Sequence, residues 1–221
     1  MAIPFKLFGM KLSRMNPNLC DTCESHFTDI MKTKQISLPA TVLFADIRGY
    51  TSLSQLTDSQ EVSTLLGGFY DRCADAIWKR DGIVNKLIGD AIFAVFNFPI
   101  TRKDHVEQAV YAGLELQKKC MEMKSLSGRP SANEVDFGIG VGIHTGDVSV
   151  GEIGQLCRDF TVIGEVVNLG SRLQGAAKPG EVVLSEAVYE KVKYEFPGIL
   201  AQTFALKGIN QPVRAYILVP D

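Results

Sequence analysis

The chain has 221 residues, of which 46% are hydrophobic and 22% charged, enough for one large domain with a substantial core. Its formal net charge of −2 gives no reason to expect a nucleic-acid partner. The five cysteines are an odd number, and three are scattered, which suits a reducing compartment better than a disulfide framework. Because no segment has the apolar length of a membrane span, we expect a cytoplasmic protein, or a module of a longer chain, without membrane contact.

Residues 1–38 differ from the rest and are predicted to form a helical extension and a linker. Apolar residues recur at helical spacing after Pro17, which predicts a short helix, and the polar run KTKQIS follows it. Further upstream, apolar residues such as Phe5 and Phe8 fit a dimer or partner contact as well as contact with a membrane surface.

Cys20, Cys23 and His26 invite interpretation as a zinc site, but one CxxC pair supplies only half of a usual ligand set. His26 adds one ligand, and completion of such a site across a dimer is one interpretation. We prefer the alternative that Cys20, Cys23 and Phe27 pack on the apolar face of a helix.

The next elements alternate between strands and helices. Residues 41–47, TVLFADI, are a continuous apolar run that ends in a carboxylate, as in a buried strand. A long helix is predicted over about 52–80, where apolar residues mark one face. Two apolar runs in VNKLIGDAIFAVF (84–96) flank Gly89-Asp90, which indicates a hairpin with its turn at this pair.

A second helix is predicted within 102–124, and a polar loop at 125–134 separates it from a strand at 137–146. A strand at 159–164 and a helix that ends before Lys178 follow. The tail, with EVVLSE, FALKG and PVRAYILV, is interpreted as a strand, a helix and two further strands. The order β-α-β-β-α-β predicts an α+β fold, a ferredoxin-like core with additional C-terminal strands and helices.

Two carboxylates are the first candidates for chemistry. Asp46 ends a buried strand, where an Asp that caps the next turn is the ordinary explanation, and Asp90 lies at a hairpin tip, where Asp is common. The helix over 52–80 connects the two strands, so we expect these strands to be adjacent and parallel. Asp46 and Asp90 then converge as hard oxygen ligands for Mg²⁺ or Mn²⁺. Two such ions about 4 Å apart drive in-line displacement at phosphorus.

Four further polar residues indicate a function only when they are considered as a set. Asn168 and Arg172 are four residues apart and share one helical face, where they can hold a sugar oxygen and a phosphate. Considered alone, Asn168 and Arg172 could equally be two solvent-exposed residues without a function. Thr161 and Lys86, likewise, fit ordinary half-exposed strand positions.

With these residues in place, the chain resembles the catalytic domain of the class III nucleotide cyclases, the adenylyl and guanylyl cyclases. The matching stretches, in order, are FADIRGYTSL, VNKLIGDAIFAVF, GIGVGIHTGDVSVGEIG, RDFTVIGEVVNLGSRL and LKG followed by PV and YIL. The resemblance runs from about residue 40 to 219 and implies a cyclase catalytic domain over 39–221 with the class III cyclase fold. It also implies two bound divalent metal ions, Mg²⁺ or Mn²⁺.

The resemblance implies a role for each candidate. Asp46 and Asp90 are similar to the family's metal-binding aspartates, with the Ile47 carbonyl as a further ligand. Lys86 and Thr161 occupy its base-selecting positions. The resemblance further implies that Asn168 orients the ribose and that Arg172 stabilises the α-phosphate in the transition state. It implies that Lys207 contacts the triphosphate. The loop with Gly49, Tyr50 and Thr51 would lie under the phosphates, where backbone N–H groups favour anions.

Hydrogen-bonding capacity favours ATP over GTP. Lys86 can only donate, which suits the N1 acceptor of adenine, and the Thr161 hydroxyl can accept from N6. Guanine presents an N1 donor, which would face another donor. The implied function is therefore an adenylyl cyclase that makes 3′,5′-cyclic AMP and pyrophosphate.

The family also implies a head-to-tail homodimer with two active sites, each with Asp46 and Asp90 from one subunit and the other role-bearing residues from its partner. The alternatives are a cyclase-like module that binds nucleotide without turnover, and a guanylyl cyclase. A different two-metal enzyme on a similar core is a third alternative, but no GGDEF-like run appears.

Overall fold

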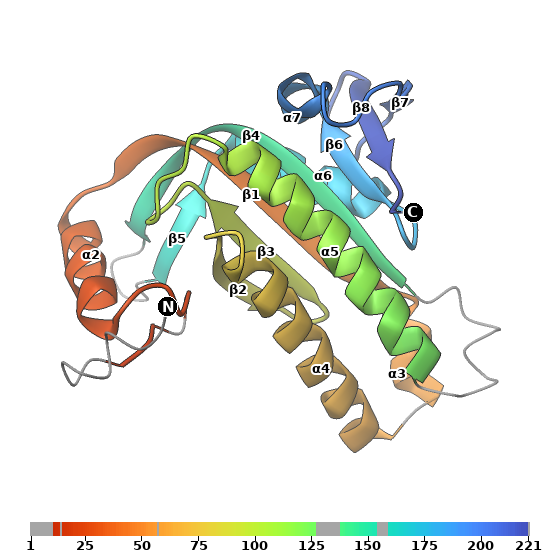
Figure 1. Cartoon of the computed structure of the whole chain (residues 1–221), viewed down its shortest axis with the longest axis horizontal. Coiled ribbons are helices and arrows are strands. Elements are labelled where there is room, and N and C mark those ends of the chain that lie inside the picture. The colour runs from red at the N-terminus through yellow and green to blue at the C-terminus, as the bar shows by residue number, and fades with distance from the viewer. Residues whose placement is uncertain (1–10, 14, 57, 127–137, 154–158, 221) are drawn as a thin grey trace.

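The computed structural model describes residues 11–13, 15–56, 58–126, 138–153 and 159–220. These residues form one eight-stranded sheet with helices on both faces (Figure 1). The strands are β1 (Ile36–Arg48), β2 (Ile83–Ile88), β3 (Ala91–Phe96), β4 (Gly138–Ile153), β5 (Asp159–Ile163), β6 (Val182–Ser185), β7 (Ala201–Phe204) and β8 (Val213–Leu218). The helices are α2 (Asp21–Thr33), α3 (Tyr50–Leu56), α4 (Ser59–Trp78), α5 (His105–Leu126), α6 (Glu165–Ala176) and α7 (Glu186–Val192).

The sheet is built around β1. Its order is β2-β3-β1-β4-β6-β8-β7, and β5 pairs with β4 beside this path. β1 is antiparallel to both β3 and β4. The predicted α+β fold with a ferredoxin-like core and C-terminal additions is confirmed. The expectation that the strands joined by the long helix are adjacent is wrong, because β3 lies between β1 and β2.

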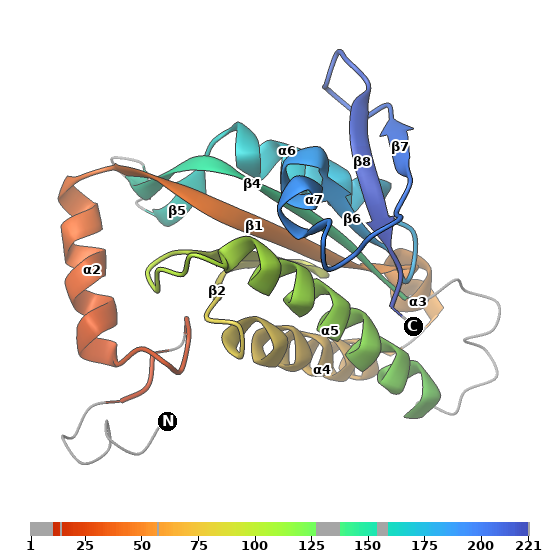
Figure 2. The same cartoon turned by 45° about the horizontal axis from the view of Figure 1, so that its top comes forward.

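Alternate residues of β1 face two different cores, as a pleated strand requires. Leu43, Ala45 and Ile47 belong to the larger core, which is covered by α4, α5 and α7. Val42 and Phe44 belong to a smaller core on the opposite face of the sheet, and α6 packs on β4 and β1 there. Figure 2 shows α4 and α5 side by side below the sheet and α6 above it.

Glycines let α6 lie close to the sheet. A Cβ on Gly170 of α6 would lie 2.7 Å from Cγ2 of Val42, and a Cβ on Gly142 of β4 would collide with the backbone of Gln174. A larger residue at either position therefore has to move the helix or its neighbours. This close approach fixes the position of every side chain that α6 carries.

Several predicted elements differ from the structure at their ends. The helix expected over 52–80 is two helices, α3 and α4, and Asp58 precedes the second. β1 and β4 are both longer than predicted. Most of the predicted polar loop at 125–134 lies outside the described residues, as do Phe5 and Phe8.

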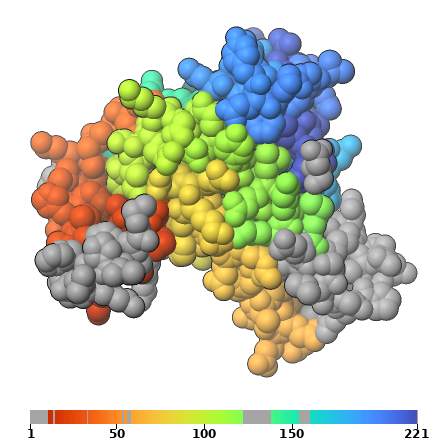
Figure 3. All heavy atoms as spheres, viewed as in Figure 1, coloured from red at the N-terminus to blue at the C-terminus, as the bar shows by residue number. Residues whose placement is uncertain are grey.

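The predicted N-terminal helix is present as α2. Cys20 is its N-cap and is buried, and Phe27 packs against the smaller core. Cys23 and His26 are exposed, so the expected packing of Cys23 is wrong. In the space-filling view α2 lies at one end of the molecule, and the C-terminal elements lie at the other (Figure 3). No helix in the described part of the chain is long and apolar enough to cross a membrane.

The contact between α6 and the sheet makes a matched pair of glycine substitutions informative. Gly170→Ala should lower the free energy of unfolding by about 1–3 kcal/mol, because the added methyl overlaps Val42. Gly175→Ala, on the same helix with no atom near the new Cβ, should raise it by about 0.5–1 kcal/mol. Urea unfolding of both variants checks this, and equal effects would contradict the proposed contact.

Candidate active site

Asp46 and Asp90 lie together at one end of the β1–β3 pair. Asp46 is in register with Ala91, the first residue of β3, and the backbone N–H of Ile47 donates to the Asp90 carbonyl over 3.3 Å. The Gly89-Asp90 turn joins β2 directly to β3, with Gly89 at a φ of 61° that glycine adopts without strain. The structure thus brings the two predicted metal ligands together, by pairing β1 with β3.

The surroundings of Asp46 disfavour its charged form. Partial burial, and after it the negative charge of Asp90, raise the pKa of Asp46 to about 6, although the Arg48 guanidinium and the Gln174 amide act in the opposite direction. A divalent cation would favour both ionised forms, and carboxylate oxygens are hard ligands that suit Mg²⁺ or Mn²⁺. The residues present therefore fit the implied metal ions. The described residues contain no group of three or more His, Cys, Asp or Glu side chains placed to hold a metal ion.

Gln174 and Arg48 both act on Asp46, and the sequence assigned no role of its own to either side chain. Arg48 Nη2 donates to the Gln174 carbonyl, and the Arg48 guanidinium occupies the space over Gly140, where a Cβ would lie 2.5 Å from Arg48 Nε. Gln174 is 8% exposed on the sheet-facing side of α6. The sequence could have indicated Gln174, because it is a polar residue on the apolar face of a predicted helix.

The loop that is expected beneath the phosphates comes directly after β1 in the chain. Gly49 has a φ of 77°, and α3 begins at Tyr50. Gly49 and Thr51 are exposed, whereas Tyr50 packs against the larger core. This segment extends from the end of β1 that carries Asp46.

Lys86 contacts the residue before Thr161, although the two segments are far apart in sequence. Lys86 Nζ donates to the Phe160 carbonyl over 3.4 Å, and Thr161 is the next residue of β5. An irregularity at Asn85 lets Val84 pack toward the larger core while Lys86 pairs with Phe93 of the smaller core. In a regular strand these two residues would share a face. The structure therefore places Lys86 beside the β5 segment that carries Thr161 within one chain.

Asn168 and Arg172 lie on the exposed side of α6. Val166, Gly170 and Leu173 are buried against the sheet, so the predicted polar pair faces away from it. Neither side chain has a hydrogen bond or ion pair with another described residue. Both are thus available to a ligand or to another subunit.

Lys207 is exposed in the turn between β7 and β8. Gly208 follows it with a φ of 78°, and the Ile209 N–H donates to the Leu206 carbonyl over 3.1 Å. The structure brings Lys207 into contact with none of the other predicted site residues in the part of the chain that it describes.

Asp46 and Thr161 lie far apart along the sheet. Asp46 pairs with Gly140 near the start of β4, whereas Thr161 pairs with Gly151 near its end. Figure 1 shows the same separation, with α3 at one end of the sheet and β5 at the other. The structure therefore places the predicted metal ligand Asp46 and the predicted base contact Thr161 at different positions along β4.

Comparisons with known proteins agree on one family. The family model described as "Adenylate and Guanylate cyclase catalytic domain" matches residues 31–220. An adenylate cyclase of Anabaena cylindrica is 31% identical over 181 residues, which is 79% of this chain and 34% of that protein. The chain spans about a third or less of the length of the curated relatives it matches first.

Solved structures of both nucleotide types are similar. The adenylyl cyclase CyaB from P. aeruginosa has a TM-score of 0.73 at 31% identity and aligns over 85% of this chain and 97% of its own. The guanylyl cyclase Cya2 has a TM-score of 0.69 at 28% identity, over 82% of this chain and 92% of its own.

The Asp46–Asp90 pair predicts a distinctive pH dependence in the presence of a chelator. Because the pKa of Asp46 is raised in the folded state, its contribution to stability is lost as pH rises from about 4 through 6. Asp46→Asn should then be more stable than the parent at pH 7.5, by about 1 kcal/mol after allowance for solvent screening. The difference should vanish near pH 4.

Thermal or urea unfolding between pH 4 and 8 measures this effect. Asp71→Asn, which changes an exposed carboxylate on α4, is the control and should show no such trend. Addition of Mn²⁺ should stabilise the parent more than Asp46→Asn. A variant that is less stable than the parent at pH 7.5 without metal would contradict the raised pKa of Asp46.

Proposed function

The chain belongs to the family of adenylate and guanylate cyclase catalytic domains, and we propose that it is an adenylyl cyclase, which converts ATP to 3′,5′-cyclic AMP and pyrophosphate. The observation that carries the choice of ATP is the meeting of Lys86 with the Phe160–Thr161 segment of β5. The resemblance in sequence gives these positions their base-selecting role.

The hydrogen-bonding groups at this point match adenine. The Lys86 ammonium has three N–H donors, so it can keep its bond to the Phe160 carbonyl and also donate to N1 of the base. The Thr161 hydroxyl accepts from the N6 amino group. Guanine would set its N1–H against the ammonium donor and leave a buried donor without an acceptor, which costs about 1–3 kcal/mol.

The proposed reaction is attack of the ribose 3′-oxygen on the α-phosphorus. The O3′–P bond forms, the bond from the α-phosphorus to the bridging oxygen breaks, pyrophosphate leaves, and the 3′-hydroxyl proton is released. Asp46, Asp90 and the Ile47 carbonyl hold two divalent ions, Mg²⁺ or Mn²⁺. When bound, these ions lower the pKa of the 3′-hydroxyl and neutralise the triphosphate.

The remaining residues orient the substrate and meet the growing charge. Asn168 holds the ribose, so that the 3′-oxygen faces the phosphorus. Arg172 donates to the α-phosphate oxygens, whose charge grows during transfer, and its planar fork suits two oxygens at once. The phosphates are held further along by Lys207 and by the Gly49–Tyr50–Thr51 loop.

A head-to-tail homodimer assembles these groups into complete sites. The separation of Asp46 and Asp90 from Thr161 along β4 supports this arrangement, because one chain presents two half-sites. Asn168 and Arg172 face away from their own sheet, as residues donated to a second subunit should. Twofold symmetry then gives two equivalent sites.

We further propose that the catalytic domain comprises residues 39–221, with residues 1–38 as an extension, and that the protein works in the cytoplasm. The cysteines in the described residues are free, which suits a reducing compartment. The net charge of −2 gives no reason to add a nucleic-acid partner.

A product assay with ATP and GTP side by side tests the function. Purified protein with Mn²⁺ should form cyclic AMP, and kcat/KM for ATP should exceed that for GTP. Lys86→Ala should reduce this preference by about tenfold or more, since it removes a charge-assisted hydrogen bond made to adenine alone. Preference for GTP would favour the guanylyl cyclase alternative, and ATP binding without any cyclic product would favour a catalytically silent module.

A further inference from the structure

The segment before β1 is fixed to the strand that carries Lys86. Asn16 is fully buried, and its Nδ2 donates to the carbonyl of Gly82, the residue directly before β2, over 2.7 Å. The Val84 N–H donates to the Met15 carbonyl over 3.4 Å, and the Trp78 indole N–H donates to the same carbonyl. These bonds tie residues 15 and 16 to the beginning of β2.

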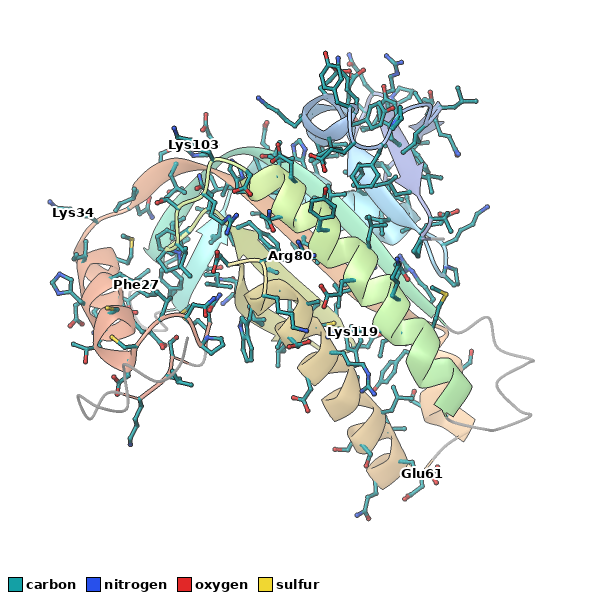
Figure 4. The ribbon with its side chains drawn as sticks, in the orientation of Figure 1. Phe27, Lys34, Glu61, Arg80, Lys103 and Lys119 are labelled. Carbon is teal, nitrogen blue, oxygen red and sulfur yellow. The ribbon has the colours of Figure 1, made fainter. Side chains whose placement is uncertain are left out.

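The helix that follows is fixed to the strand that carries Thr161. Phe27 of α2 extends toward β5 (Figure 4) and forms a three-ring cluster with Phe98 and Phe160. The ring centroids are 5.7 Å apart for Phe27–Phe98, 6.1 Å for Phe27–Phe160 and 6.0 Å for Phe98–Phe160. Such pairs contribute about 0.5–1.5 kcal/mol each beyond the burial of their area.

Phe160 joins this cluster to the base-selecting pair. Its ring packs on Phe27 and Phe98, while its carbonyl accepts the hydrogen bond from Lys86 Nζ. Thr161 is the next residue of the chain. A shift of the Phe160 ring therefore moves the backbone group that holds Lys86 and the residue that carries the second base contact.

We propose that Phe27 is a positioning residue for adenine recognition, which acts on Lys86 through Phe160. The inference rests on the proposed function, because it assumes that Lys86 reads the base. α2 then does more than extend the domain, since it sets the precision with which ATP is distinguished from GTP. The metal-type carboxylates and Arg172 lie outside the three-ring cluster, so the chemical step should be much less sensitive to Phe27.

A purely structural role for Phe27 predicts something different, namely a general loss of stability with no particular effect on base selection. The comparison variant is Phe196→Leu, which also shortens a half-buried phenylalanine. Phe196 packs against the larger core beside Tyr111 and is not part of the three-ring cluster that contains Phe160. Phe27→Leu and Phe196→Leu should lose similar amounts of stability but differ in base selection.

The experiment uses the full chain in four forms: the parent, Phe27→Leu, Lys86→Ala and the double variant, with Phe196→Leu as control. Binding of 3′-deoxy-ATP and 3′-deoxy-GTP with Mn²⁺, measured by calorimetry, reports base selection without turnover. Phe27→Leu should weaken binding of the adenine analogue about 5- to 10-fold, which corresponds to partial loss of one hydrogen bond to a charged group. It should leave binding of the guanine analogue unchanged and raise KM for ATP more than it lowers kcat.

The double variant identifies the route of the effect. If Phe27 acts through Lys86, then Phe27→Leu should change base selection little once Lys86 is alanine, so the two effects should not add. Additive effects, or a Phe27→Leu protein with the same selectivity as Phe196→Leu, would overturn the inference while leaving the proposed function intact. No change of selectivity in Lys86→Ala itself would overturn the base assignment and the inference with it.

Phe27→Met provides a second variant of nearly conserved volume if Phe27→Leu does not fold. It removes the aromatic contacts but retains most of the buried apolar surface. The same loss of adenine preference is expected, and unchanged selectivity in this variant would also overturn the inference.

Discussion

The repulsion between Asp46 and Asp90 is the constraint around which the rest of the site is arranged. Their distance is fixed by the antiparallel register of β1 and β3, because Asp46 pairs with the residue directly after Asp90. Partial burial disfavours the charged form of Asp46, the negative charge of Asp90 adds to this, and the pKa of Asp46 rises as a result. A fold that holds two carboxylates in this way favours cations as ligands, and under the proposed function a nucleoside triphosphate arrives with such divalent ions.

The same sheet separates Thr161 from this charged end. β4 spans both groups, with the partner of Asp46 near its beginning and the partner of Thr161 near its end. α6 lies close to the sheet through Gly142 and Gly170, and it turns Asn168 and Arg172 outward. Under the proposed function, a rigid sheet with an outward-facing helix is well suited to giving one half-site and receiving another in a symmetric pair.

The sequence predicted the elements that local chemistry determines and missed features that depend on contacts between distant segments. The Gly89-Asp90 turn, α2 and the order of strands and helices followed from turn residues and apolar periodicity. The break between α3 and α4 was missed, although Asp58 followed by Glu61 has the spacing of a capping box. The convergence of Asp46 and Asp90 was expected for the wrong reason, since β3 and not β2 is the neighbour of β1. No local pattern reports the Phe27–Phe98–Phe160 cluster or the bond between Arg48 and Gln174, because each joins separate segments.

Subunit mixing tests most directly whether two chains complete each other's sites. Asp46→Ala and Arg172→Ala should each lose activity by about a hundredfold or more, since one removes a metal ligand and the other a transition-state contact. After subunit exchange at equal amounts, half of the dimers are mixed, and each mixed dimer has one site with both residues intact. The account predicts recovery of about a quarter of the parent activity. Activity no higher than that of the separate variants, in a mixture whose exchange is demonstrated by energy transfer between labelled subunits, would contradict it.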